Sequence, residues 1–212
     1  MSRGRFITFE GGEGGGKTTQ IRRLEARLTA AGRTVVRTRE PGGSPGAEEI
    51  RPLLLTGDPG KWSASSEALL NYAARNDHIE RVIAPALARG DWVLCDRFAD
   101  STRAYQGAAG GAPEGLIVAL ETWIVGDTRP DLTLVLDLPA DVGLERSMAR
   151  AANTETRYEA KGLAFHERLR ERFLAIARAE PGRCAVIDAS GSPDEVEARV
   201  WAAVQDRLAV HG

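Results

Sequence analysis

The sequence has no excess of positive charge and no long apolar run, and each shortage counts against a class of function. Three of its 28 basic residues are lysine, Lys17, Lys61 and Lys161, and its formal net charge is -2. A protein that binds nucleic acid nonspecifically is usually clearly basic, so no nucleic-acid partner is expected. No apolar run approaches the ~20 residues of a membrane span, and no membrane partner is expected. The apolar stretch at residues 6–9 is far too short for the core of a signal peptide.

Cysteine is also scarce, and this bears on the compartment. Cys95 and Cys184 both lie in apolar runs typical of strands. Buried reduced thiols are therefore expected rather than a disulfide or a metal site. Together with the lack of a targeting segment, this predicts a cytoplasmic protein.

Histidine and tryptophan give no sign of a catalytic site. The three histidines are His78, His166 and His211, and none has a carboxylate or cysteine partner at catalytic spacing. They are expected to be solvated or to lie at an interface. The four tryptophans are expected to serve packing.

What the sequence does contain is an alternation of strand and helix patterns. Apolar strands are predicted at 5–10, 34–38, 91–96, 132–138 and 184–188. Helices are predicted at 18–31, 47–55, 65–89, 113–126, 141–151, 161–179 and 193–209. Strands that are apolar throughout and alternate with helices favour a parallel sheet covered on both faces. The sequence therefore predicts a single α/β domain over residues 1–212, with a mobile flap in the polar stretch 149–162.

A glycine-rich stretch between the first strand and the first helix carries the strongest motif. Residues 11–18, GGEGGGKT, match the phosphate-loop pattern G-x-x-x-x-G-K-[ST] in its proper context. Glycines let successive N–H groups turn toward an anion, and the helix N-terminus adds partial positive charge. Lys17 would reach the β- and γ-phosphates and Thr18 would ligate Mg²⁺. The predicted ATP-binding set is Gly11, Gly12, Glu13, Gly14, Gly15, Gly16, Lys17, Thr18 and Thr19.

A second polar cluster follows the third predicted strand. Asp96 and Arg97 lie at its carboxyl end, which in an open parallel sheet faces the ligand crevice. Asp96 would hold Mg²⁺ through water or position an acceptor phosphate, and Arg97 would clamp that phosphate. The chain has no N-K-x-D motif of a GTPase and is short for a larger ATPase. A small kinase with a second site for an acceptor fits best.

The segments FEGGEGGGKTTQ, TREPGG, LLNYAAR, DRF and STRAYQG occur in this order between residues 9 and 107. In this combination the sequence resembles the thymidylate kinase family. The resemblance implies a three-layer P-loop kinase core, a five-stranded parallel sheet with helices on both faces and a small lid, here 146–161. It also implies transfer of the γ-phosphoryl of ATP to dTMP, giving dTDP, with Mg²⁺. A homodimer formed through the long helix 65–89 is also implied, with packing of this helix inside the chain as the alternative that the sequence leaves open.

The resemblance also assigns roles in the acceptor site. Arg97 would grip the dTMP phosphate, assisted by Arg51, while Arg75 and Gln106 would hydrogen-bond the thymine edge. Tyr105 would pack under the deoxyribose and disfavour a 2′-hydroxyl. The predicted substrate-binding set is Glu40, Pro41, Arg51, Asn71, Tyr72, Arg75, Arg97, Ser101, Tyr105 and Gln106.

The same resemblance implies the catalytic groups. Glu13 falls where the family carries an acidic loop residue near the 3′-hydroxyl of the acceptor. Family members place a helping arginine either in the phosphate loop or in the lid. Residue 14 is glycine here, so a lid arginine is expected, Arg150 first and Arg146 next. The predicted catalytic set is Lys17, Arg97, Glu13, Asp96, Arg150 and Arg146, with Thr18 and Asp96 as metal ligands.

One position departs from the family pattern. Asn71 stands where the family usually has a phenylalanine that stacks on thymine. This keeps open a related nucleoside-monophosphate or deoxynucleoside kinase with another base preference. A nucleotide-binding switch that phosphorylates no small molecule is a third hypothesis, against which Arg97, Arg75 and the lid arginines count.

Overall fold

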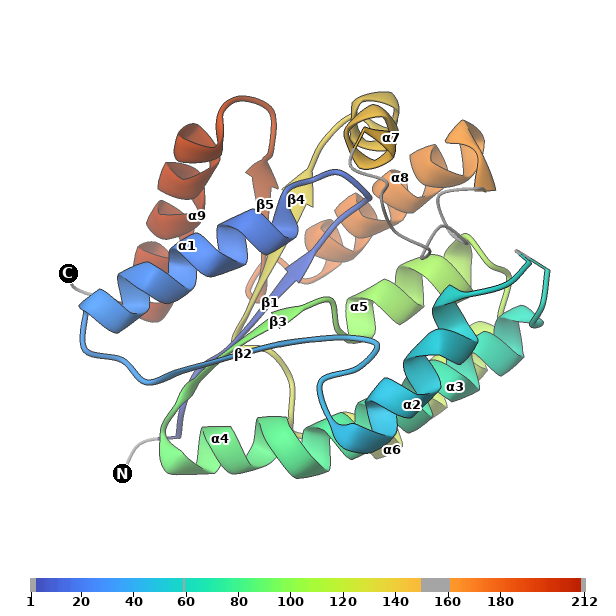
Figure 1. The fold of residues 1–212 in the computed structure, drawn as a ribbon, viewed down its shortest axis with the longest axis horizontal. Helices are drawn as coiled ribbons and strands as arrows, with labels where there is room; N and C mark the ends of the chain where they lie inside the picture. The colour runs from blue at the N-terminus through green and yellow to red at the C-terminus, as the bar shows by residue number, and fades with distance from the viewer. Residues whose placement is uncertain (1–2, 59, 150–160, 211–212) are drawn as a thin grey trace.

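A computed structural model describes residues 3–58, 60–149 and 161–210. It contains one parallel sheet of five strands in the order β2-β3-β1-β4-β5 (Figure 1). This confirms the α/β fold predicted from the sequence. Most of the predicted lid, residues 150–160, lies outside the described residues. The strands are β1 Phe6–Glu10, β2 Val35–Arg39, β3 Trp92–Asp96, β4 Leu132–Asp137 and β5 Cys184–Asp188.

Helices cover both faces of the sheet, which makes three layers (Figure 1). On one face α1 and α9 pack together, and their apolar side chains join the inward side chains of β1 and β4 in one core cluster. On the other face lie η1, α4, α8 and η2. The helices are α1 Lys17–Ala30, α2 Pro45–Leu55, α3 Ala64–His78, η1 Ile79–Ile83, α4 Ala84–Arg89, α5 Ala99–Thr102, η2 Arg103–Ala108, α6 Glu114–Ile124, α7 Ala140–Met148, α8 Leu163–Ala179 and α9 Pro193–Leu208.

The strand order places the candidate site. The chain leaves β1 for β2 and β3 on one side, then crosses to β4 on the other side of β1. Ligand crevices form where the connections diverge in this way, outside the carboxyl ends of the strands. Phe9 of β1 lies opposite Asp96 of β3. The phosphate loop and the Asp96–Arg97 turn are therefore neighbours.

Several local predictions were incomplete or wrong. The predicted helix at 65–89 is observed as α3, a π-helical turn η1 and α4, while the helical turns of α5 and η2 were missed. Trp123 was assigned to packing but is 88% exposed. His78 and His166 were expected to be solvated or to lie at an interface, yet both are buried, and His78 is hydrogen-bonded to Glu40 and Thr38. Its partners lie on a strand and a loop that the sequence alone does not bring to the helix.

No helix in the described part of the chain is long and apolar enough to cross a bilayer.

Candidate active site

The phosphate loop is shaped by glycine and anchored by its own lysine. Gly14 and Gly16 have φ values of 69° and 82°, a region that only glycine adopts readily. The ammonium of Lys17 folds back and donates to the carbonyls of Gly11 and Gly12, at 3.2 and 2.7 Å. Burial, and after it the positive charge of Arg97, lower the pKa of Lys17 to about 8. The carboxylates of Glu13 and Asp96 act in the opposite direction but do not offset this lowering of the pKa.

The loop also packs backbone to backbone on α7. A Cβ atom added to Gly14 would lie 2.0 Å from the carbonyl oxygen of Gly143. A Cβ atom added to Gly143 would lie 2.5 Å from the carbonyl oxygen of Glu13. Glycine is therefore required on both sides of this contact.

The two predicted metal ligands lie together at the start of α1. The Thr18 hydroxyl donates to the Asp96 carboxylate at 3.0 Å, and both residues line a cavity of about 200 Å³ beside Lys17 and Arg97. No cluster of three or more His, Cys, Asp or Glu side chains suited to a metal occurs in the described part of the chain. One hydroxyl and one carboxylate fit Mg²⁺, which takes few protein ligands and keeps waters and phosphate oxygens. Thr19, the residue after Thr18, was predicted to bind ATP, but its side chain is exposed and does not line this cavity.

Arg97 is held in an unusual backbone conformation just after β3. Its φ of 70° is in the left-handed region, which non-glycine residues rarely occupy. Its guanidinium donates to the Gly11 carbonyl at 3.0 Å, to the Ser101 hydroxyl at 3.2 Å and to the Glu13 carboxylate at 2.9 Å. Strained residues of this kind cluster at functional sites. The Arg97 guanidinium therefore lies between the phosphate loop and α5.

A buried carboxylate fixes the turn that carries Arg97. Glu10, at the end of β1, accepts from the backbone N–H groups of Phe98 and Ser101, at 2.8 and 3.2 Å. It also accepts from the Ser101 hydroxyl at 2.6 Å. Burial, with the charge of Asp100, raises the pKa of Glu10 to about 7.

Glu13 connects the phosphate loop to the opposite wall. One of its carboxylate oxygens accepts from Arg97, and the same atom accepts from the Tyr105 hydroxyl at 2.7 Å. Burial alone would raise the pKa of Glu13, but Arg97 and Lys17 outweigh it and lower that pKa to about 2. The carboxyl is therefore ionised across the working range of a cell.

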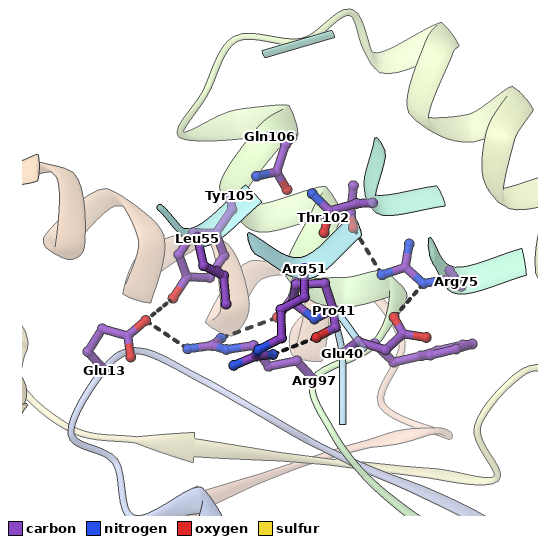
Figure 2. Close-up of a pocket in the computed structure, with 13 residues that line it drawn as sticks. Glu13, Glu40, Pro41, Arg51, Leu55, Arg75, Arg97, Thr102, Tyr105 and Gln106 are labelled. Atoms are coloured by element: carbon purple, nitrogen blue, oxygen red, sulfur yellow. Dashed lines mark hydrogen bonds and ion pairs between the residues drawn. The ribbon is translucent and has the colours of Figure 1, made fainter. Parts of the chain in front are cut away.

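A second cavity has a volume of about 190 Å³, and Figure 2 shows the residues that line it. The two linings share Glu13, Glu40, Arg51 and Arg97. Nine of the ten predicted substrate-binding residues line the second cavity; Tyr72 does not. Leu55, Phe98 and Thr102 also line it and were missed, although Phe98 and Thr102 lie inside the DRF and STRAYQG motifs and were within reach. The nine are Glu40, Pro41, Arg51, Asn71, Arg75, Arg97, Ser101, Tyr105 and Gln106.

The far end of the second cavity holds a buried guanidinium. Arg75 is 2% exposed, and it donates to the Glu40 carboxylate at 2.8 Å and to the Thr102 hydroxyl at 3.1 Å (Figure 2). Its remaining nitrogen, Nη1, is buried and has no partner. The guanidinium lies 4.6 Å from the centre of the Tyr72 ring. Tyr72 therefore packs its ring against the Arg75 guanidinium and does not line the cavity.

Arg146, the second candidate for the lid arginine, is not part of this arrangement. Arg146, on α7, donates to the Ala189 carbonyl at 3.5 Å and lines neither cavity. Its neighbour Ser147 does line the phosphate-loop cavity. Arg150 lies outside the described residues.

Two cavities thus meet at the carboxyl edge of a parallel sheet, one beside the glycine-rich loop and Lys17 and the other beside Arg75, Tyr105 and Gln106. This fold and site define a P-loop phosphotransferase with a nucleotide donor and a small acceptor. The profile of the family described as thymidylate kinase matches residues 9–200, and the chain belongs to that family.

Individual relatives agree with this assignment. The chain is 64% identical to a thymidylate kinase of Caulobacter vibrioides, covering 98% of this chain and 99% of the relative. It is 56% identical to a thymidylate kinase of Bradyrhizobium diazoefficiens, covering 97% and 91%. The crystal structure of thymidylate kinase from Ehrlichia chaffeensis superposes with a TM-score of 0.78 at 33% identity, covering 96% of this chain and all of that one.

Proposed function

We propose that the phosphate-loop cavity holds ATP and the second cavity holds dTMP. Membership of the thymidylate kinase family makes the chain a transferase of nucleotide biosynthesis that phosphorylates dTMP with ATP. The observation that carries the assignment of sites is the junction of the two cavities at Glu13 and Arg97. A kinase that acts on another base, or a switch without a small acceptor, is not favoured by this family membership.

On the donor side, the loop N–H groups and Lys17 would bind the β- and γ-phosphates. Their fixed charges neutralise the transferring group, which is the main contribution a protein makes to phosphoryl transfer. Thr18 and Asp96 would hold Mg²⁺, which supplies further positive charge to the phosphate oxygens. The carbonyl contacts of Lys17 would be exchanged for phosphate contacts when the nucleotide binds.

On the acceptor side, Arg97 and Arg51 would hold the dTMP phosphate opposite Lys17. Two anions repel each other, and cations between them offset that repulsion and align the reacting oxygens. Tyr105 and the Glu13 carboxylate would face the sugar. Arg75 and Gln106 would meet the edge of the base.

An acceptor panel tests this proposal. ADP release would be measured with ATP and Mg²⁺ against dTMP, dUMP, dCMP, dGMP and thymidine. Release with dTMP far above the others is expected. Release with no member of the panel would overturn the proposal in favour of a nucleotide-binding switch, and a preference for another base would reassign the second cavity.

A homodimer and a cytoplasmic location stay predictions from the sequence. Three large apolar side chains are exposed on α3 and α6, which pack against each other. They are Leu69, Val118 and Trp123, exposed by 50%, 56% and 88%. Exposed apolar side chains gathered in this way suit a subunit contact. Sedimentation equilibrium is expected to give a dimer that Trp123→Ser weakens, and a monomer at micromolar concentration would contradict it.

A further inference from the structure

A buried carboxylate stands behind the second cavity without lining it. Glu67, in the first turn of α3, is 4% exposed. It accepts a hydrogen bond from Nε2 of Gln106 at 3.1 Å. Gln106 is itself buried and does line the cavity. Glu67 therefore contacts the cavity through another side chain.

This contact sets the direction of the Gln106 amide. The oxygen and nitrogen of an amide have nearly the same size, so only hydrogen-bond partners decide which end points where. A carboxylate accepts hydrogen bonds and donates none. Glu67 can therefore bind only the nitrogen end of Gln106, and the cavity is offered the carbonyl oxygen, an acceptor.

Arg75 supplies the opposite polarity nearby. Its buried Nη1 has no partner and donates only, and its residue lines the same cavity (Figure 2). A thymine or uracil edge has an accepting oxygen at C4 and a donating N3–H. A cytosine edge has a donating amine at C4 and an accepting N3, which is the reverse. The pair formed by Arg75 and Gln106 matches the first edge and opposes the second.

We propose that Glu67 is the positioning residue that makes the acceptor site select thymine over cytosine. It acts by fixing the amide of Gln106, and it touches no substrate. The proposal rests on the assignment of dTMP to the second cavity.

Asn71 offers an internal comparison. Its side-chain nitrogen donates to the backbone carbonyl of Glu67 at 2.9 Å, not to the carboxylate. A change of the Glu67 side chain therefore releases the amide of Gln106 and leaves the amide of Asn71 held. The effect is confined to one of the two amides that line the cavity.

The positioning role of Glu67 is tested by Glu67→Gln. This change keeps the size of the side chain but replaces a carboxylate, which only accepts hydrogen bonds, by an amide, which both accepts and donates. An amide at residue 67 can turn either end toward Gln106, so Gln106 can show a donor to the cavity. The ratio of kcat/KM for dTMP to kcat/KM for dCMP is expected to fall about ten-fold, the scale of one mispaired buried hydrogen bond. Glu121→Gln is the matched control, because Glu121 is 6% exposed, binds Arg103 and lines neither of the two cavities. It is expected to leave the ratio unchanged.

A double variant tests the direction of the amide. With Glu67→Gln and Gln106→Glu together, the carboxylate moves to residue 106, accepts from the new amide and shows its second oxygen to the cavity. The dTMP preference is expected to return. If Glu67→Gln does not fold, Glu67→Met removes the acceptor with similar bulk, and the same fall in the ratio is expected.

The outcomes separate this proposal from the proposed function. If the unmodified protein does not prefer dTMP, the assignment of the acceptor fails. If it does prefer dTMP and the folded Glu67→Gln variant keeps the same ratio, or loses activity equally with both nucleotides, the positioning role is overturned.

Discussion

The donor cavity and the acceptor cavity of the candidate site differ in which parts of the chain line them. One contiguous, glycine-rich stretch, residues 13–18, supplies six of the twelve residues that line the donor cavity, and its lysine folds back onto the loop. The acceptor cavity consists of side chains that come from the phosphate loop, α2, α3 and the segment after β3. A backbone cradle depends on the absence of side chains. A side-chain cavity depends on the identity of each one, and changes in it should alter selectivity before they abolish activity.

The largest effect is expected where the donor cavity does use a side chain. Lys17→Ala removes the ammonium that would meet the β- and γ-phosphates, and kcat/KM is expected to fall roughly 10²–10³-fold or more. The circular dichroism spectrum and the thermal midpoint should hardly change. The matched control is Lys61→Ala, at an exposed lysine beside Trp62. Substantial turnover by the Lys17 variant would remove that residue from the donor site.

The main-chain character of the donor cavity is tested by adding a methyl group. Gly14→Ala brings a Cβ atom to 2.0 Å from the Gly143 carbonyl at a φ of 69°. A loss of about 1–3 kcal/mol in the free energy of unfolding is expected, with weaker ATP binding. Gly12→Ala is the control, because nothing lies within 4 Å of its added Cβ. Equal denaturation midpoints for the two variants would argue against the close packing on α7.

In the acceptor cavity, a gain of function is expected from Asn71→Phe. An aromatic ring that stacks on a base contributes ~1–3 kcal/mol in nucleic-acid systems, so dTMP should bind about ten-fold more tightly. Asn71→Leu has apolar bulk without the ring and serves as the control. Titration calorimetry with dTMP would measure the dissociation constants of the two variants and of the unmodified protein. An unchanged affinity would mean that other residues of the cavity already compensate for the missing ring.

A smaller change in selectivity is expected from Tyr105→Ala. Removal of the ring should open space beside the 2′-carbon, and the ratio of ribo- to deoxyribonucleotide turnover should rise several-fold, the scale of one lost packing contact. Tyr105→Phe keeps the ring and loses only the hydrogen bond to Glu13, so it should leave the ratio near that of the unmodified protein. A ratio that does not move in the alanine variant would exclude Tyr105 as the sugar gate.

The smallest expected effect is a dependence of ATP affinity on pH. Lys17 is charged below its pKa, which is about 8 in the ligand-free protein. Above that value the ammonium loses its proton, and a triphosphate must draw the proton back as it binds. Affinity should be about three-fold weaker at pH 8.5 than at pH 7.5, as linkage of one proton requires. Calorimetry in buffers of different ionisation enthalpy should detect this proton uptake, whereas constant affinity from pH 7 to 9 would contradict it.

The same contrast explains how far the sequence could be interpreted. The phosphate loop could be predicted because its residues are contiguous, and β1, β3 and β4 could be predicted because they are buried and mostly apolar, whereas β2 and β5 are partly exposed. Residues 99–108 were not predicted to be helical, since the segment combines a four-residue helix with a π-helical turn and has too few residues to show a period. The burial of His78 follows from its contacts with Thr38 and Glu40, which are distant in the chain. The separation of Tyr72 from the cavity depends on which face of α3 turns toward the cavity: Asn71 and Arg75 line it, whereas Tyr72 packs in a core cluster with Phe6 and Phe98.

The backbone of residue 97 has a consequence for the natural history of the protein. An L-amino acid in the left-handed region is less stable there than glycine by about 1–2 kcal/mol. The backbone conformation alone would favour glycine, but glycine would leave the Glu13 carboxylate without its ion pair to the guanidinium. Arg97→Gly should therefore relax the turn and destabilise the phosphate loop at the same time, so directed evolution for thermal tolerance would have to replace Glu13 before it could replace Arg97.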